Sequence, residues 1–442
     1  MTYRETLDFL YARLPMFHRI GPAAFKKDLT NTVALCEHLG NPHLKFRSIH
    51  VGGTNGKGSV SHMLAAVCHA AGLRTGLYVS PHYKDFRERI KIDGRYIPRS
   101  RVVEFVDTNR AAIEKIQPSF FELCVAMAFD HFARERVDVA VVEVGLGGRL
   151  DSTNIITPLL SVITNISYDH MNMLGDTLPQ IAFEKAGIIK PGVPVVIGET
   201  HPESAPVFIK KAAETGSEIV FADQHYRAEE KVSGVENNSY STIYDIYKNG
   251  DLFLEDLAVQ AAGPFQAKNV ATAMQAVEML QQAPFVPAAL FAGTLPGSLR
   301  EGLARLKDFT RFMGRWQIIG RNPTVLCDSA HNEAGLRSAF EKINQLAKSA
   351  GARLHIVTGF VNDKDVDKAL GLFPREARYY FARANIPRGL EAAVLKEKSA
   401  LHGLHGKAYS SVKNALKAAR RAAAADDLIV VTGSIFVVAE VI

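Results

Sequence analysis

The sequence predicts an α/β protein. It would comprise a doubly wound, mostly parallel sheet domain with a P-loop and a small β-insert, then a smaller, Rossmann-like α/β C-terminal domain. Short apolar runs alternate with helical patterns throughout the 442 residues, which is typical of parallel sheets covered by helices. One apolar run stops at glycines clustered around Lys57, and the texture changes near Tyr240 and near Phe312. A chain of this length is expected to form two or three domains.

The first domain, for which we expect the bounds 1–308, contains five apolar runs of strand length. They lie at 46–51, 137–144, 159–166, 193–197 and 219–222. Apolar residues at helical spacing lie between them, at 60–71, 101–116, 120–134 and 178–189. In such sheets, ligands bind beyond the carboxyl ends of the strands. The glycine cluster and Glu143 fall at such ends, so we expect the functional site there.

The β-insert is predicted at residues 240–259. Asn249-Gly250 separates two apolar runs there, and Asn-Gly between such runs is a strong hairpin signal. A helix then follows the segment Phe265–Asn269 and ends near Gln282. We expect a linker at 307–314 and a second domain at 312–442, with strands at 316–319, 324–327, 354–358, 378–381 and 428–431 and an Ala-rich helix at 412–425.

The composition is that of a globular protein, with 47% hydrophobic and 22% charged residues. The net charge of +6 suits acidic ligands. Basic runs are no longer than two residues, as at Arg420-Arg421, so we expect no nucleic-acid partner. The longest apolar stretch, 428–438, is too short to span a membrane. The N-terminus lacks the shape of a signal peptide, and the four scattered cysteines suggest reduced thiols. We therefore expect a cytoplasmic protein.

The glycine cluster Gly52-Gly53-Thr54-Asn55-Gly56-Lys57-Gly58-Ser59 lies between a strand and a helix. In that context, backbone N–H groups and a lysine cradle the phosphates of a nucleotide. We therefore expect an enzyme that uses ATP, with Lys57 on the β- and γ-phosphates. The usual P-loop has Ser or Thr directly after its lysine, whereas Gly58 here moves the hydroxyl to Ser59. An ordinary tight turn is the alternative.

The shifted loop, residues 53–59, resembles the nucleotide loop of folylpolyglutamate and dihydrofolate synthases, relatives of the Mur ligases. Further family-like motifs follow in order, at Ser80-Pro81-His82, Glu88–Ile90, Glu143–Asn154, Asp169-His170, Glu184–Ile188, Asp328–Asn332 and Thr432–Ser434. The resemblance therefore covers nearly the whole chain. It implies an ATP-binding, Mur ligase-like first domain and a C-terminal ligase domain.

The resemblance also implies which residues act. The implied nucleotide-binding residues are Gly53, Thr54, Asn55, Gly56, Lys57, Gly58, Ser59, Asn269, Arg315, Asp328 and Ser434. The implied metal ligands are Ser59, Ser80, Glu143 and His170. The implied catalytic residues are Lys57, Lys185 and His331. The implied cofactors are ATP and two Mg²⁺ ions, and the resemblance allows a carbamylated Lys185 and a K⁺ ion.

Several of these positions have a plain structural alternative. Glu143 ends a strand of Val and Ala, where an acid is costly unless it binds something, but it could equally cap a helix or form a salt bridge. Histidine is an unusual Mg²⁺ ligand, so His170 could be structural. Lys185 could be an exposed lysine on a helix face. His331 and Ser434 could be ordinary loop residues.

The implied reaction is the ATP-dependent addition of L-glutamate to the carboxylate of dihydropteroate or a reduced folate, through an acyl phosphate. We expect a monomer that has both activities. The segment 17–25 lies where family members contact the pterin. The rival functions are a Mur-type ligase of cell-wall synthesis and a P-loop ATPase that drives a partner. The short stretch before Lys57 argues against the first, because Mur ligases carry a further N-terminal domain.

Overall fold

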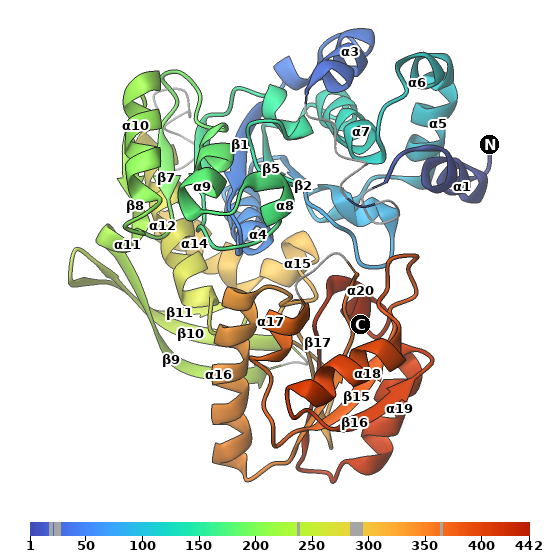
Figure 1. The fold of residues 1–442 in the computed structure, drawn as a ribbon. Coiled ribbons are helices and arrows are strands. Elements are labelled where there is room, and N and C mark those ends of the chain that lie inside the picture. Colours follow the sequence, from blue (N-terminus) through green and yellow to red (C-terminus); the bar gives the residue numbers. More distant parts are fainter. Residues whose placement is uncertain (17–20, 22–27, 237–238, 283–294, 363–365) are drawn as a thin grey trace. The chain divides into compact units, whose positions relative to one another are not determined.

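The structure, a computed structural model, describes residues 1–16, 21, 28–236, 239–282, 295–362 and 366–442 (Figure 1). The chain divides into two compact units. The first comprises residues 1–232, 243–260 and 266–312, and the second 233–242, 261–265 and 313–442. Each unit contains its own large sheet, and each is described separately.

The first unit contains an eight-stranded sheet in the order β4-β3-β2-β5-β1-β6-β7-β8. Its strands are β1 (Arg47–Gly52), β2 (Thr75–Tyr78), β3 (Ile90–Ile92), β4 (Arg95–Tyr96), β5 (Val139–Glu143), β6 (Leu160–Ile163), β7 (Val195–Ile197) and β8 (Ile219–Phe221). Neighbouring strands from β2 to β8 pair in parallel, whereas β3 and β4 form an antiparallel edge. The central strand β1 lies between β5 and β6, so the ends of these three strands meet at one edge of the sheet.

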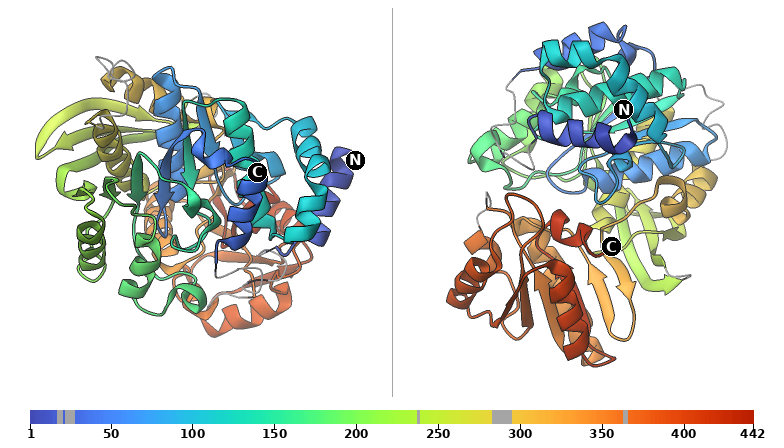
Figure 2. Two further views of the ribbon diagram at one scale, coloured as in Figure 1. Left: turned by 90° about the horizontal axis from the view of Figure 1, so that it is seen from above. Right: turned by 90° about the vertical axis from the view of Figure 1, so that its right-hand side faces the viewer.

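Helices surround this sheet (Figure 2). They are α1 (Tyr3–Arg13), α3 (Thr30–His38), α4 (Lys57–Ala70), α5 (Arg99–Thr108), α6 (Arg110–Ile116), α7 (Phe120–Arg134), α8 (Met171–Leu174), α9 (Leu178–Ala186), α10 (Ala205–Thr215), α11 (Ala222–His225), α12 (Gln266–Gln282), α14 (Leu295–Ala304) and α15 (Leu306–Thr310). Three short 3₁₀ helices lie at Pro42–Leu44, Phe86–Arg89 and Ser152–Ile155. Helix α4 packs against β1, β2 and β5 and is covered by α12, α14 and α15. The first helix after β1 is therefore held in the core.

The predicted β-insert is a three-stranded sheet of β9 (Tyr226–Glu236), β10 (Ser239–Lys248) and β11 (Asp251–Val259). The hairpin between β10 and β11 turns at Asn249 and Gly250, both with positive φ, 51° and 95°. A two-residue turn with positive φ at both positions matches the twist of the strands that it joins.

The second unit contains a six-stranded sheet in the order β12-β13-β17-β14-β15-β16. Its strands are β12 (Gln317–Gly320), β13 (Thr324–Cys327), β14 (Leu354–Thr358), β15 (Arg378–Ala382), β16 (Gly406–Tyr409) and β17 (Leu428–Thr432). Only β12 pairs antiparallel. The helices are α16 (Glu333–Ala350), α17 (Val366–Leu370), α18 (Ala392–Leu401), α19 (Val412–Ala422) and α20 (Ile435–Ala439). Strand β17 lies between β13 and β14, so the loops after β13 and β17 share one edge.

The expected helix 412–425 ends earlier, at Ala422, and two other expected helix boundaries are wrong for a visible physical reason. The predicted helix 101–116 breaks at Asn109, whose backbone N–H and side-chain amide both donate to the Phe105 carbonyl, so the side chain competes with the helical pattern. Helix α9 ends at Ala186 instead of continuing to Ile189. A Cβ on Gly187 would lie 2.4 Å from Cα of Arg149, so the chain passes another segment closely at this point.

Candidate active site

The glycine loop joins β1 to α4, and two of its glycines are required by their surroundings. Gly53 and Gly56 have positive φ, 131° and 85°. A Cβ on Gly53 would lie 1.9 Å from Thr164 Oγ1, and one on Gly56 would lie 2.3 Å from Asn269 Oδ1. Side chains at these positions are therefore excluded by both conformation and contact. The backbone of the loop therefore packs closely against its neighbours. The loop lies at the point where the strand order of the sheet reverses.

The segment that follows β6 holds the loop in shape. Thr54 N donates to the Asn165 carbonyl at 2.8 Å, and Asn55 N donates to Asn165 Oδ1 at 2.9 Å. Ser167 N donates to Thr54 Oγ1 at 3.1 Å. Strand β6 was predicted to continue to residue 166. It ends at Ile163 because the chain turns here to bind the loop.

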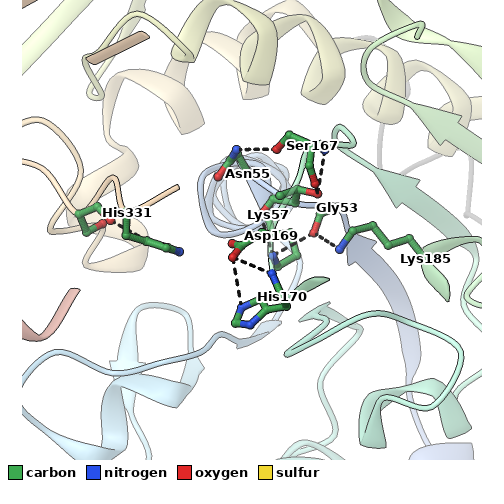
Figure 3. Close-up of polar contacts among 10 residues, drawn as sticks. Gly53, Asn55, Lys57, Ser167, Asp169, His170, Lys185 and His331 are labelled. Atoms are coloured by element: carbon green, nitrogen blue, oxygen red, sulfur yellow. Dashed lines mark hydrogen bonds and ion pairs between the residues drawn. The ribbon is translucent and has the colours of Figure 1, made fainter. Parts of the chain in front are cut away.

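Two lysines from different helices converge on the loop (Figure 3). Lys57 Nζ donates to the carbonyls of Gly53 and Thr54 at 3.0 and 3.1 Å. Lys185 Nζ, from α9, donates to the same Gly53 carbonyl at 2.8 Å. The two ammonium groups thus share one acceptor, which concentrates positive charge where phosphates of a nucleotide would lie.

The structure excludes the alternative in which Lys185 is an exposed lysine on a helix face. Its side chain is buried, with 4% of the residue exposed. Burial, together with the nearby charge of Lys57, lowers the pKa of Lys185 to about 7. Near neutral pH the amine is therefore partly uncharged, which makes it a nucleophile.

The glycine-rich segment after β5 supports α9. A Cβ on Gly148 would lie 2.8 Å from the Glu184 carbonyl and 2.9 Å from the Lys185 carbonyl. The segment closes on Asp151, a buried acid that accepts from Leu146 N at 2.8 Å and from Thr153 N at 3.0 Å. Burial raises the pKa of Asp151. The segment after β5 therefore packs closely against the backbone of α9 at Lys185.

Glu143, at the end of β5, lies beside the start of α4. One carboxylate oxygen accepts from Ser80 N at 2.9 Å, and a Cβ on Gly58 would lie 3.5 Å from the other. The residue is only 4% exposed. A buried carboxylate next to the phosphate-binding loop can hold a cation, since Mg²⁺ commonly takes one or two carboxylates together with substrate phosphates.

The oxygen donors around Glu143 fit Mg²⁺ by type. Ser59, two residues into α4, is 2% exposed, and Ser80 follows β2. In the described part of the chain, no group of three His, Cys, Asp or Glu residues is arranged to hold a metal ion. The residues thus offer one carboxylate and two hydroxyls, a set that suits a Mg²⁺ shared with phosphate oxygens.

His170 lies at the start of α8, with φ of 51°. Its backbone N donates to Asp169 Oδ1 at 2.9 Å, and its ring Nε2 lies 3.9 Å from the same oxygen (Figure 3). The side chain is 31% exposed. The structure therefore pairs the predicted metal ligand His170 with Asp169.

Gln266 contacts two of the predicted site residues and was not itself predicted. It begins α12, is fully buried, and donates from Nε2 to Ser59 Oγ at 3.4 Å. Its Oε1 accepts from Asn269 Nδ2 at 2.9 Å. Gln266 thus links two predicted nucleotide-binding residues, and a glutamine before a helix carries no spacing signal that could have identified it.

The predicted site residues of the second unit follow β13 and β17. Buried Asp328 accepts from Trp316 N and Ala330 N, each at 2.9 Å, and its own N donates to the Val431 carbonyl at 3.0 Å. Burial raises the pKa of Asp328, and Arg315 opposes that shift. These contacts join the loop after β13 to the end of β17.

His331 and Ser434 lie on these two loops. His331 Nδ1 lies 2.9 Å from the Ser329 carbonyl. A carbonyl can only accept, so Nδ1 carries the proton and Nε2 is the acceptor of the neutral ring. Ser434 caps α20 by accepting from Phe436 N at 3.2 Å. Both side chains thus lie at the carboxyl edge of the sheet, where ligands bind in this type of fold.

Comparison with protein families identifies the class of protein. Residues 51–277 match the Mur ligase middle domain, and residues 314–435 match the glutamate ligase domain of Mur ligases. The chain is therefore built from the two catalytic modules of Mur-type ligases.

Comparison with individual proteins identifies the family within that class. The chain is 34% identical to a folylpolyglutamate synthase of Lacticaseibacillus casei, covering 100% of this chain and 98% of the relative. It is 31% identical to a dihydrofolate synthase/folylpolyglutamate synthase of Bacillus subtilis, over 99% of this chain and 98% of the relative. The chain belongs to the folylpolyglutamate synthase/dihydrofolate synthase family, a family of ATP-dependent ligases.

Solved structures agree with this assignment. Folylpolyglutamate synthase from Thermotoga maritima has a TM-score of 0.78 at 32% identity and covers 99% of this chain and 95% of its own. The Escherichia coli protein FolC in complex with DHPP and ADP has a TM-score of 0.81 at 28% identity, over 100% and 97% of the two chains. The predicted family, fold class and enzyme class are confirmed.

Two further sequence-based expectations have a structural counterpart. Cys36, Cys68, Cys124 and Cys327 are all free and buried. No helix in the described ranges is both long and apolar enough to cross a bilayer. The segment 17–25, expected near the pterin, lies outside the described residues apart from Gly21.

Proposed function

We propose that this protein uses ATP to join L-glutamate to the carboxylate of dihydropteroate or a reduced folate. The observation that carries the proposal is the convergence of Lys57 and Lys185 on the Gly53 carbonyl, at 3.0 and 2.8 Å. A glycine loop with one lysine serves any ATPase. A second, buried lysine on the same carbonyl fits an enzyme that transfers two groups in succession. These are the phosphoryl group of ATP and the acyl group of the acyl phosphate.

In this proposal the glycine loop binds the phosphates of ATP. Backbone N–H groups of residues 53–58 and the positive end of α4 attract phosphate oxygens, and Lys57 moves from the loop carbonyls to the β- and γ-phosphates. Ser59, Ser80 and Glu143 would hold Mg²⁺, with His170 and Asp169 at a second ion. When bound, Mg²⁺ supplies charge neutralisation on the phosphate oxygens.

Lys185 is proposed to react with CO₂. Its neutral amine attacks the carbon, and loss of one proton leaves a carbamate anion in place of an ammonium. The pKa of Lys185, lowered to about 7 by burial, makes the required neutral amine available. The change would also convert the repulsion between Lys57 and Lys185 into attraction, which favours the modification at a buried site.

The acceptor carboxylate would attack the γ-phosphorus, forming an acyl phosphate and ADP. The amine of glutamate then attacks the acyl carbon, and phosphate leaves. We assign the first step to an ATP-binding domain, residues 1–308, and glutamate placement to a ligase domain, residues 312–442. His331 and Ser434 are proposed to position the amino acid, and Asn269, Arg315 and Asp328 to contact ATP.

We propose that both acceptors are used. Full-length relatives carry the double name dihydrofolate synthase/folylpolyglutamate synthase. The residues at the glycine loop would act on ATP and Mg²⁺ in the same way for either acceptor, so the choice rests with the pterin-binding part of the chain. We further propose a cytoplasmic monomer, with K⁺ as an additional ion.

The test is ligase turnover with each acceptor separately. Purified protein, ATP, Mg²⁺ and L-glutamate are combined with dihydropteroate in one assay and with tetrahydrofolate in another, and ADP and the glutamylated product are measured. Glutamate-dependent product with both acceptors is expected. ADP release that is unaffected by both acceptor and glutamate would contradict the proposal and indicate a P-loop ATPase. Product with amino-sugar nucleotide precursors only would indicate a cell-wall ligase.

A further inference from the structure

Helix α19 of the second unit carries a stripe of four cations. Its apolar side, formed by Val412, Ala415, Leu416 and Ala419, is buried. Its outer side presents Lys413, Lys417, Arg420 and Arg421, all exposed. Successive members of this set are four, three and one positions apart, so they share one helix face. The sequence conceals this stripe because only Arg420 and Arg421 are adjacent.

A cavity of about 420 Å³ lies along the stripe. It is lined by the four cations together with Leu416, Glu440 and Val441, so it lies between α19 and the residues that follow α20. Glu440, the acid in this lining, has a partner of its own, since its Oε1 accepts from Asn385 N at 2.8 Å. We call this cavity the basic groove.

The stability of α19 explains only part of the stripe. Arg420 and Arg421 lie in the last turn, where positive charge interacts well with the helix dipole. Lys413 lies in the first turn, which contains no acidic residue, so its charge is unfavourable there. Lys413 and Lys417, and Lys417 and Arg421, are also like-charged pairs four residues apart, which destabilise a helix.

The four cations are not neutralised within the protein. Over the described ranges, none of them forms an ion pair. Arg420 lies beside the end of β12, since a Cβ on Gly320 would lie 3.2 Å from its Nη2. The groove is concave and brings like charges together, although these charges destabilise α19. Such a surface is suited to a multiply charged anion.

We propose that the basic groove binds the γ-linked glutamate tail of a long-chain folate. This inference rests on the proposed function, which makes such tails. The cations from Lys413 to Arg421 span about 12 Å along the helix, a length that several carboxylates of an extended chain can follow. Lysine and arginine bind carboxylates through charge-assisted hydrogen bonds. The groove would thus hold the tail as it lengthens.

The experiment measures binding of folate with one glutamate and of folate pentaglutamate to the full-length protein by calorimetry at low salt. The test variant is Lys417→Ala/Arg421→Ala, which leaves Arg420, beside Gly320, unchanged. The control variant is Lys396→Ala/Lys407→Ala, which removes two exposed cations of the same unit outside the groove. In the wild type, the pentaglutamate should bind more tightly than the monoglutamate.

The test variant should lose affinity for the pentaglutamate by about fivefold, the size expected for two exposed charge pairs, and keep its affinity for the monoglutamate. The control should behave like the wild type. Equal losses in test and control variants, or wild-type affinity independent of tail length, would overturn the inference. So would tight, groove-dependent binding of a single-stranded oligonucleotide that a pentaglutamate does not displace.

The outcome is separable from that of the proposed function. Ligase turnover with a monoglutamate acceptor tests the reaction and does not require the groove. A protein that is an active ligase but shows no groove-dependent tail binding would overturn this inference alone. Absence of ligase activity in all variants would overturn the proposed function, and with it the reason for naming a glutamate tail.

Discussion

Lys57 Nζ and Lys185 Nζ donate to the same oxygen, the carbonyl of Gly53, from 3.0 and 2.8 Å. The first lysine begins the helix after the glycine loop, and the second comes from α9, more than a hundred residues later in the chain. Close approach of two ammonium groups is unfavourable unless an anion lies near them. The arrangement is therefore suited to a site that receives phosphate or a carbamate.

Replacing Lys57 with alanine should reduce ligase activity by roughly 10² to 10³, the loss typical of removing one charge-stabilising donor. The fold should survive, because Lys57 Nζ donates to carbonyls of the loop itself. Turnover and melting temperature are measured together. Lys45→Ala, an exposed lysine before β1, is the control, and near-normal turnover of Lys57→Ala would refute the phosphate assignment.

Lys185 should carry a carbamate in the active protein. With ¹³C-labelled bicarbonate at a pH above 7, where the amine is mostly neutral because its pKa is about 7, the wild type should show a carbamate resonance by ¹³C NMR. Lys185→Arg keeps a cation but cannot form this carbamate, so it should lose both the resonance and most of the activity. An active wild-type protein without the resonance would rule out the modification.

Gly56 and Gly58 should respond in opposite ways to alanine. A Cβ on Gly56 would lie 2.3 Å from Asn269 Oδ1, at positive φ, so Gly56→Ala should weaken ATP binding and lower the melting temperature. A Cβ on Gly58 would contact only Glu143, at 3.5 Å. Because Gly58 lies in α4, alanine there should maintain stability or raise it by up to about 1 kcal/mol.

ATP affinity and thermal unfolding of the two glycine variants decide this prediction. Comparable destabilisation of both proteins would mean that the loop is not held as tightly as its contacts indicate. Loss of Mg²⁺-dependent activity in Gly58→Ala, with ATP binding intact, is the expected consequence of crowding Glu143.

Lys91 should make the stability of the protein depend on pH. It is 3% exposed and donates to the Thr310 carbonyl at 3.0 Å. Burial lowers the pKa of Lys91 from 10.5 to about 7. Between these values the unfolded chain binds the extra proton, so this lysine makes stability rise with pH, by at most about 1.4 kcal/mol per pH unit.

Lys91→Met removes this titration, so comparison with the wild type isolates it. Melting temperatures of both proteins are measured from pH 7 to pH 10. The variant should be favoured most near pH 7, and its advantage over the wild type should shrink as pH rises. A difference that is constant over this range would show that Lys91 keeps its proton in the folded state. Lys84→Met, at a lysine outside the core, is the control.

The residues that the sequence predicts for the first-unit site sit on strong local patterns. Glycines after an apolar run identify a phosphate loop, and an acid that ends a buried strand identifies Glu143. The glycine at position 58, where the usual P-loop has Ser or Thr, also has a physical reason. Gly58 faces the oxygens of Glu143 at 3.5 and 3.9 Å from its would-be Cβ, so a bulkier residue would occupy space beside the carboxylate.

Some residues make their contacts with distant parts of the chain. The sequence did not predict these residues, or left open whether they are buried. Gln266 bonds Ser59, 207 positions away, and no periodicity in the sequence records such a pairing. Gly148 packs closely against the backbone of Glu184 and Lys185 in α9. This contact between distant segments accompanies the burial of Lys185. The stripe on α19 was read as dispersed charge because only helix geometry brings its members to one face.

The most direct test of the ligase mechanism follows one oxygen atom. Dihydropteroate labelled with ¹⁸O in its carboxylate is turned over with ATP and L-glutamate, and the released phosphate is analysed by mass spectrometry. Formation of an acyl phosphate, followed by attack of the amine, transfers one labelled oxygen to each phosphate, and this is the predicted result. Phosphate that contains oxygen only from ATP and water would contradict the mechanism.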